Sequence, residues 1–454
     1  MRRRTLLQSL GLAGAGIATG TAGAHPLPTD DGPVTPGSTP TGGDPLGSLD
    51  LSGARELVTS ADGHTAYVAT GSGIALVDVV SPANPRLLAE RTDLLAESAD
   101  GPMEYVQDVA VSEDRLLVVG PAHPADGAHG MVVFDVSDRE NPERVAAYET
   151  ATRIHNCDFD GRYAYLAGVG RVDSPLVVVD TETGTEVGTW ALPDADDAWR
   201  EVPASVRPLH DVTVRNGHAY LAYWDAGTWI VDISDPDDIS LVSRVRGRDR
   251  ETLAAIEDPA TERREPPGND HFVTVDDDAS LLGVGGESWD LDDDGTGGPS
   301  GIELFDISDP TAPESLATID PPDTSDPSVG GVLTTAHNFE LTDDRLYSAW
   351  YNGGVRVHDV RDPSAPRELF RWRDSGTTSF WTAQRGAGCF LATSTNQNTG
   401  SEVTPGVYTF PDPAIDAPTA TATDDGVLGA AGDGFGVLSA IAAAGLAAWR
   451  LQRR

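Results

Sequence analysis

The chain has 454 residues, with 72 aspartates and glutamates against 31 arginines and lysines, and its formal net charge at pH 7 is −41. The sequence contains no lysine and no basic patch that would neutralise phosphates, which argues against nucleic acid as a partner. Carboxylates spread along the whole chain attract cations and keep a protein hydrated in concentrated salt, where screening removes most of their mutual repulsion. We therefore expect a halophilic protein.

The first 24 residues have the pattern of a secretory signal. Three arginines at positions 2–4 precede an apolar run of small residues, and Ala22-Gly23-Ala24 has the A-x-A form of a cleavage site. The paired arginines indicate the twin-arginine export route. Residues 25–45 are rich in proline, glycine and threonine and are expected to form a linker.

Seven related units fill residues 46–411. Each unit begins with an alternating strand, passes through a tight polar turn to a second strand and a third, and closes with a fourth. The first strands are expected at 54–60, 106–112, 154–160, 209–215, 270–276, 336–342 and 380–386. Successive short-stranded units rich in β-branched and aromatic residues predict an all-β fold, a seven-bladed β-propeller with four-stranded blades.

Two features complete the predicted ring. The seventh unit has no fourth strand after Phe410, and a matching segment, residues 46–51, precedes the first unit. We expect this N-terminal strand to pair with the last blade, which removes an exposed sheet edge.

The aspartate that ends the third strand is expected to accept backbone N–H groups of the following turn, at Asp78, Asp135, Asp180, Asp232, Asp306 and Asp359.

The third strands carry a family resemblance. They read, for example, IALVDV from Ile74, LVVVDT from Leu176 and WIVDIS from Trp229. This pattern resembles the LVIVD-repeat family of surface β-propellers, which is common in haloarchaea. The resemblance covers about residues 46–411 and implies the propeller fold. The family has no agreed catalytic motif, so the resemblance implies no active site.

Strand direction places all the long connections on one face of the predicted propeller. These connections are residues 91–105, 121–130, 193–208, 247–269, 285–300, 320–335 and 394–405. Long loops on a rigid scaffold concentrate binding function, so this face is the functional candidate. We expect it to recognise an extracellular protein or a small ligand, and we expect the propeller to be monomeric.

One position of the repeat holds a histidine in four consecutive blades: His155, His210, His271 and His337. This position lies at the entry to the innermost strand, at the long-loop mouth of the central channel. Ring closure therefore turns four imidazoles toward one axis, where they could ligate copper, zinc, iron or nickel. Candidates for additional ligands on the same face are Glu56, His123 and His129.

A structural interpretation of the histidines stays open. Each one shares its strand face with apolar residues, as His210 does with Val212 and Val214, and can be a hydrogen-bonded core residue. Further candidates for contact with a ligand at the mouth are the equivalent or following residues of the repeat: Arg55, Gln107, Asn156, Asp211, Asn338 and Trp381.

Two functions are compatible with these patterns. The first is an exported, membrane-anchored binding or interaction module, favoured by the absence of a catalytic motif. The alternative is a metal-dependent oxidoreductase or hydrolase that uses the histidine cluster. Seven-bladed selenium-binding-type proteins, some of them thiol oxidases, are similar in placing histidines at a channel mouth, which is an analogy of fold alone.

A calcium loop is a second candidate site. Asp290, Asp292 and Asp294, followed by Gly295, form the pattern D-x-D-x-D-G, in which alternate carboxylates wrap a hard cation. The acid expected at the twelfth loop position is replaced by Gly301, and a solvated surface loop is the alternative. The two cysteines, Cys157 and Cys389, are expected to be buried free thiols.

The C-terminal segment is expected to reach a membrane. Residues 412–433 form a polar linker, and residues 434–454 contain an apolar run of small residues closed by arginines. The arrangement resembles the tails that archaeal sortase-type enzymes cut, although Asp433-Gly434-Phe435 stands where those tails carry Pro-Gly-Phe. An uncut tail anchor is the alternative.

Overall fold

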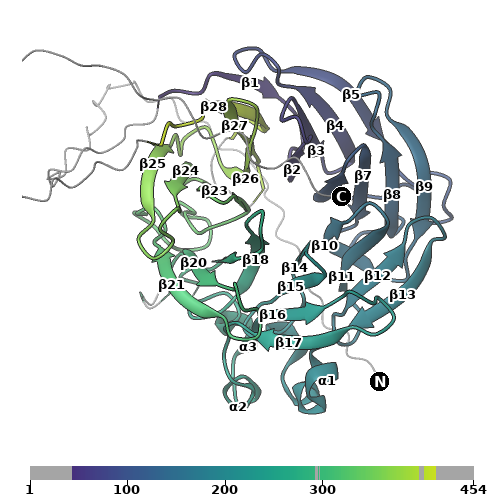
Figure 1. Cartoon of the computed structure of the whole chain (residues 1–454), viewed down its shortest axis with the longest axis vertical. Helices are drawn as coiled ribbons and strands as arrows, with labels where there is room; N and C mark the ends of the chain where they lie inside the picture. The colour runs from purple at the N-terminus through teal and green to yellow at the C-terminus, as the bar shows by residue number, and fades with distance from the viewer. Residues whose placement is uncertain (1–42, 292–294, 296, 398–402, 416–454) are drawn as a thin grey trace, which may run out of the picture.

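A computed structural model of the chain describes residues 43–291, 295, 297–397 and 403–415. Within them, seven antiparallel sheets of four strands each stand around a central channel (Figure 1). The predicted seven-bladed β-propeller is therefore confirmed. The signal segment, most of the N-terminal linker and the C-terminal tail lie outside the described residues, so their expected roles stay predictions.

Each blade runs from an inner strand at the channel to an outer strand at the rim (Figure 1). The first three blades are β2–β5 (Leu57–Thr59, Thr65–Ala69, Gly73–Asp78, Arg86–Thr92), β6–β9 (Asp108–Ser112, Arg115–Gly120, Gly130–Asp135, Glu143–Glu149) and β10–β13 (Arg153–Phe159, Tyr163–Val169, Leu176–Asp180, Thr185–Trp190). The next three are β14–β17 (Asp211–Arg215, His218–Tyr223, Gly227–Asp232, Ser240–Arg244), β18–β21 (Asp270–Val275, Leu281–Gly286, Ile302–Asp306, Glu314–Ile319) and β22–β25 (Phe339–Leu341, Arg345–Ala349, Val355–Asp359, Arg367–Trp372).

The seventh blade joins the two ends of the propeller. Its inner strands are β26 (Phe380–Arg385), β27 (Cys389–Ser394) and β28 (Gly406–Pro411), and its outer strand is β1 (Gly47–Asp50). β1 pairs antiparallel with β28, with Leu49 opposite Val407. The predicted closure of the ring by the N-terminal strand is thus present, because β1 covers the edge that β28 would otherwise expose.

The apolar core lies between neighbouring blades. One cluster joins the first and second blades, and another joins the third and fourth around three buried tryptophans, Trp190, Trp199 and Trp229. A third cluster closes the ring by packing Leu51 and Leu57 against Leu391 of the seventh blade. Cys157 and Cys389 are buried in such clusters as free thiols, which confirms the expectation for both.

Two long connections on the histidine side contain short helices that the sequence pattern did not reveal. The connection from β13 to β14 forms α1 (Leu192–Ala195) and two 3₁₀ turns, η1 (Asp197–Glu201) and η2 (Ala204–Val206); the connection from β17 to β18 forms α2 (Arg250–Ala254) and α3 (Pro259–Glu262). Their brevity explains why no helical periodicity marks them. In the part of the chain that the structure describes, no helix has the length and apolar character needed to span a membrane.

The aspartates at the ends of the third strands play the predicted structural role. Each carboxylate accepts a hydrogen bond from a backbone N–H two residues later, at distances of 2.8 to 3.2 Å, in Asp78, Asp135, Asp180, Asp232, Asp306 and Asp359. The bond fixes the turn that leads into the outer strand. The repeated aspartate therefore belongs to the architecture and leaves the histidine position as the functional candidate.

We expect Asp359→Ala to lower the free energy of unfolding by about 2 kcal/mol at pH 7, because charge-assisted hydrogen bonds are lost. The carboxylate accepts from the Arg361 N–H, and it pairs with the side chains of Arg361 and Arg367 at 2.8 and 3.2 Å. Arg361 is the main cause that lowers the pKa of Asp359 to about 2. The stabilisation is therefore complete above about pH 4 and lost as the pH falls through 2. Thermal unfolding at pH 7 and pH 2.5 measures both effects.

Asp362→Ala is the matched control, because the Asp362 carboxylate accepts the Ser364 N–H in an exposed turn nearby. An equal loss of stability in the two variants would contradict the special role of the strand-ending aspartate.

Candidate ligand and metal site

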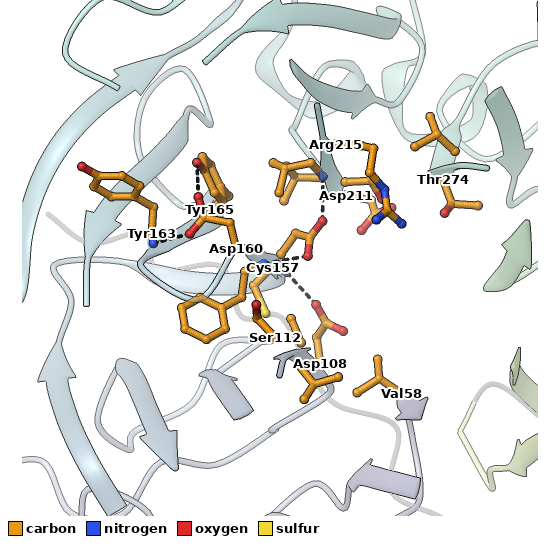
Figure 2. Close-up of a pocket in the computed structure, with 18 of the residues that line it drawn as sticks. Val58, Asp108, Ser112, Cys157, Asp160, Tyr163, Tyr165, Asp211, Arg215 and Thr274 are labelled. Carbon is orange, nitrogen blue, oxygen red and sulfur yellow. Dashed lines mark hydrogen bonds between the residues drawn. The ribbon is translucent and has the colours of Figure 1, made fainter. Parts of the chain in front are cut away.

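The central channel has a cavity at each end. The cavity on the long-loop side, here called the mouth cavity, has a volume of about 370 Å³, and loop residues such as Ala122, Ser205 and Gln397 form part of its wall. The cavity on the opposite side, here called the acidic cavity, has a volume of about 700 Å³. Its carboxylates include Glu56, Asp108, Asp158, Asp211 and Glu340. Figure 2 shows two of them, Asp108 and Asp211.

The structure brings the four repeated histidines together in the wall of the mouth cavity. The ring centroids of His155 and His210 are 4.2 Å apart, those of His210 and His271 are 3.7 Å apart, and those of His271 and His337 are 5.0 Å apart. His155 and His271 lie within β-bulges of their inner strands, where an extra residue re-aims a side chain. The four imidazoles therefore form one continuous row.

Three of these histidines hydrogen-bond through Nδ1 to a backbone carbonyl. His155 Nδ1 lies 3.2 Å from Ala122 O, His210 Nδ1 lies 2.7 Å from His271 O, and His337 Nδ1 lies 2.6 Å from Trp381 O. A carbonyl oxygen only accepts, so Nδ1 carries the hydrogen and Nε2 keeps its lone pair. The structural interpretation thus accounts for the Nδ1 atoms, while Nε2 remains able to bind a ligand.

Burial keeps these imidazoles neutral. Loss of hydration lowers the pKa of His155 to about 4 and that of His337 to about 3, and it holds the pKa values of His210 and His271 well below the usual range. The neighbouring imidazoles lower these pKa values further, since a proton on one ring would repel a proton on the next. Neutral imidazole is the form that ligates metal ions, so the row is in its metal-binding form at pH 7.

The carboxylate nearest the row is Glu287, which follows β19 and which the sequence analysis did not single out. Its Oε2 lies 3.2 Å from His271 Nε2, and its Oε1 accepts the hydroxyl of Tyr351 at 2.5 Å. Burial is the main cause that raises the pKa of Glu287 to about 7, against the opposing effects of Tyr351 and Arg264. One ligand atom from each of His271, Glu287 and His337 lies within 4.8 Å of the others. These three residues are the best-placed candidate ligands for a metal ion among the described residues.

A polar network forms one side of the rim. Gln397 Oε1 accepts from Arg55 Nε at 2.7 Å and from Gln107 Nε2 at 2.8 Å. The ring of His123 lies 5.6 Å from that of His155 and lines the same cavity. Three residues that the sequence placed at the mouth therefore lie together there, joined by a glutamine that has no equivalent in the repeat pattern.

Aromatic rings form other walls of the mouth cavity. The Trp381 ring lies 4.1 Å from that of His337, and the Trp224 ring stacks on His210 at 6.2 Å. The guanidinium of Arg263 lies 5.6 Å from the centre of the Trp224 ring. The cavity thus combines flat apolar surfaces with cationic and neutral polar groups, which is a usual composition of a small-ligand site.

The other residues predicted for the site are placed differently. Asn156 and Asn338 line the mouth cavity from the next position along the inner strands, and their side-chain amides donate to Asp211 and Glu56, respectively. Glu56 and Asp211 line the acidic cavity. His129 is not among the residues of the mouth cavity, and its carbonyl accepts the Thr150 N–H beside β8.

The acidic cavity is built from carboxylates that connect neighbouring blades. The Asp108 carboxylate accepts the Cys157 N–H at 2.6 Å, Asp158 accepts the Val214 N–H at 2.6 Å, and Asp211 accepts the Val273 N–H at 2.9 Å. Figure 2 shows the Asp108 carboxylate beside Cys157, with the hydrogen bond drawn as a dashed line. Each carboxylate joins its inner strand to that of the next blade, so these residues have a structural role in the ring.

The candidate calcium loop is described only in part. Asp292 and Asp294 lie outside the described residues, so their predicted role stays a prediction. Asp290 is 2 % exposed, and its Oδ2 accepts the Gly295 N–H at 3.1 Å. This bond joins the first aspartate of the pattern to the loop glycine.

Comparisons with known proteins agree with the observed architecture. Residues 104–150 and 208–246 match the family model of the LVIVD repeat. The structure is similar to the β-propeller domain of Cps50 (Swd1) from Myceliophteria thermophila, with a TM-score of 0.53 and 9% sequence identity over 81% of this chain and 99% of that one. At that identity the likeness shows the fold alone. No curated protein matches the sequence.

Proposed function

We propose that this β-propeller, which contains LVIVD repeats, is a binding module that takes a small anionic ligand into the mouth cavity. The observation that carries this proposal is the charge of the cavity wall. The wall contains the guanidinium groups of Arg153 and Arg263, although the whole chain has a net charge of −41. A cationic hollow in so acidic a surface attracts anions, which the surrounding carboxylates repel.

The carboxylates of the same wall offset this charge only in part. The two that line the cavity are Asp108 and Glu287, and burial raises the pKa of both, that of Glu287 to about 7. Arg263 Nε has no hydrogen-bond partner among the described residues, and its guanidinium is stacked near Trp224. A stacked guanidinium presents its N–H edge to a planar anion. A carboxylate with a flat apolar body fits this combination.

The test uses benzoate and phenylacetate as probes and benzylammonium as the cationic control, with binding followed by tryptophan fluorescence. We expect the two carboxylates to bind saturably, and benzylammonium to bind at least 10-fold more weakly. Arg263→Ala with Arg153→Ala should weaken carboxylate binding by about 10-fold or more, about 1.4 kcal/mol. Arg215→Ala, in the acidic cavity, is the matched control for loss of an arginine. Equal carboxylate binding by the wild type, the double arginine variant and Arg215→Ala would overturn the proposal.

A second candidate function is a metal-dependent oxidoreductase or hydrolase, favoured by the close approach of His271, Glu287 and His337. Mass spectrometry of the probes after incubation with metal-loaded protein separates the two functions. Probes recovered unchanged support a binding module. Conversion that disappears in His337→Ala supports an enzyme.

The proposed setting is the outer face of a cell membrane. The support is the signal pattern of residues 1–24 and the apolar run within residues 434–454. Replacing the arginines at positions 2 and 3 by lysine should keep the protein inside the cell, and removing residues 434–454 should release it into the medium. Immunoblots of cytoplasm, membrane and medium give the result, and unchanged distribution of both variants would refute the setting.

A further inference from the structure

We propose that His271, Glu287 and His337 form a three-ligand site for a divalent first-row transition-metal ion, with an open coordination position facing the mouth cavity. The three residues come from two blades: His271 is the second residue of β18, Glu287 follows β19 of the same blade, and His337 precedes β22 of the next. The three residues are 2 to 8 % exposed. The ring of the propeller therefore delivers all three from rigid strand ends, which is how precise metal sites are built.

The distances suit a shared ion after a small adjustment. Ligand atoms that bind one ion at about 2.1 Å lie about 3 to 3.5 Å from one another. His271 Nε2 and Glu287 Oε2 already lie 3.2 Å apart, and the whole set lies within 4.8 Å. Separations of up to 4.8 Å within the set must shorten by roughly 1 Å for the three atoms to share one ion.

The surroundings orient two of the three ligands, His337 and Glu287, as metal sites require. The Trp381 carbonyl holds His337 Nδ1 at 2.6 Å and so directs the lone pair of Nε2, and the Tyr351 hydroxyl holds Glu287 Oε1 at 2.5 Å. The rings of Trp381 and Tyr351 lie 4.1 and 4.7 Å from that of His337. Hydrogen-bonded partners of this kind fix ring orientation and ligand basicity around bound metals. The site therefore has a supporting shell as well as ligands.

The ligand types select the class of metal. Two imidazoles and one carboxylate favour Zn²⁺, Fe²⁺, Co²⁺ or Ni²⁺ over Ca²⁺ and Mg²⁺, which prefer oxygen ligands only. Three protein ligands leave a position for water or an exogenous anion, as in catalytic rather than structural metal sites. His210 lies 3.7 Å from His271, ring centre to ring centre, and is the nearest further imidazole.

The test is titration of chelator-treated full-length protein with Co²⁺ in 2 M NaCl and excess Mg²⁺, which suppress non-specific binding to surface carboxylates. We expect one ion per chain by equilibrium dialysis and a visible Co²⁺ absorption band. His271→Ala with His337→Ala should weaken binding at least 100-fold, and Tyr351→Phe by about 10-fold. His218→Ala, at the start of β15, is the control for loss of a histidine and should bind as the wild type does.

A misfolded double variant would also lose Co²⁺ binding, so a second variant is needed. Glu287→Gln keeps the shape of the side chain. It should bind Co²⁺ at least 10-fold more weakly and show unchanged thermal unfolding. Less than one ion per wild-type chain, or equal affinity in the wild type and Glu287→Gln, would overturn the metal site. This test is independent of the anionic ligand. Metal binding without carboxylate binding would contradict only the proposed function. Carboxylate binding without metal binding would contradict only the metal site.

Discussion

Removing residues 43–51 is expected to destabilise the whole propeller, with a fall of at least about 5 kcal/mol in the free energy of unfolding. The deletion takes away β1, its pairing with β28, and the flanking bonds from Leu46 N to Thr409 O and from Leu51 N to Pro405 O. It also removes Leu51, which is 5 % exposed in the cluster that joins the first and last blades. Size-exclusion chromatography and thermal unfolding should show aggregation and a much lower transition temperature.

A chain that begins at residue 43 is the control, because it keeps β1 and loses only the segment before it. Leu51→Ala isolates the side chain from the strand pairing and should cost about 3 kcal/mol. A deletion variant that unfolds at the temperature of the control would show that the ring holds without its closing strand.

Most of the fold follows from the repeat itself. Seven first strands and six strand-ending aspartates appear in the sequence at nearly constant register, and the missing fourth strand points to its replacement at the other terminus. One further signal was available: a glycine opens the third strand in most units. At Gly227 a Cβ atom would lie 1.8 Å from Arg246 O, and at Gly354 it would lie 2.0 Å from Trp372 O. The outer strand approaches too closely there for any other residue.

The histidine row was predictable and the rest of the site was not. The row repeats once per blade, so alignment of the units places it on one axis. Glu287 and Tyr351 each follow a second strand and have no counterpart in the other units. Glu287 reaches His271 within the fifth blade, and the packing of the sixth blade against the fifth brings Tyr351 to Glu287. Glu56, the carboxylate expected near the histidines, follows Arg55 in the chain. Successive side chains in a strand alternate in direction, and Glu56 lies in the acidic cavity.

The acidic cavity shows a second limit of sequence reasoning. A carboxylate after the repeated histidine position looks like a channel-lining ligand, and Asp211 was one candidate. The Asp211 carboxylate accepts hydrogen bonds from the Val273 N–H and from Asn156 Nδ2, both at 2.9 Å. Asp211 therefore connects three blades. Which of these roles a polar residue has depends on the backbone of the neighbouring blade, and that information is not local in sequence.

Asp211→Asn is expected to change how stability depends on pH. Burial is the main cause that raises the pKa of Asp211 to about 7, against its hydrogen bonds, and the residue is 3 % exposed. Because the folded-state pKa lies above the unfolded value of about 3.9, this carboxyl lowers stability progressively as the pH rises from about 4 to 7, and fully above 7. Asparagine has no such cost. Relative to the wild type, the variant should therefore gain about 3 kcal/mol between pH 5 and pH 8.5.

The measurement compares urea unfolding of both proteins at pH 5 and pH 8.5, at fixed salt. Asparagine at position 211 still accepts the Val273 N–H, but its amide group faces that of Asn156. The variant can therefore lose the same amount of stability at both pH values. The prediction concerns only the change in relative stability between pH 5 and pH 8.5. Asp100→Asn removes one charge from an exposed position and should show no such change. A stability difference between the variant and the wild type that stays constant across this range would mean that Asp211 is ionised in the folded protein at pH 5, and that its two hydrogen bonds outweigh its burial.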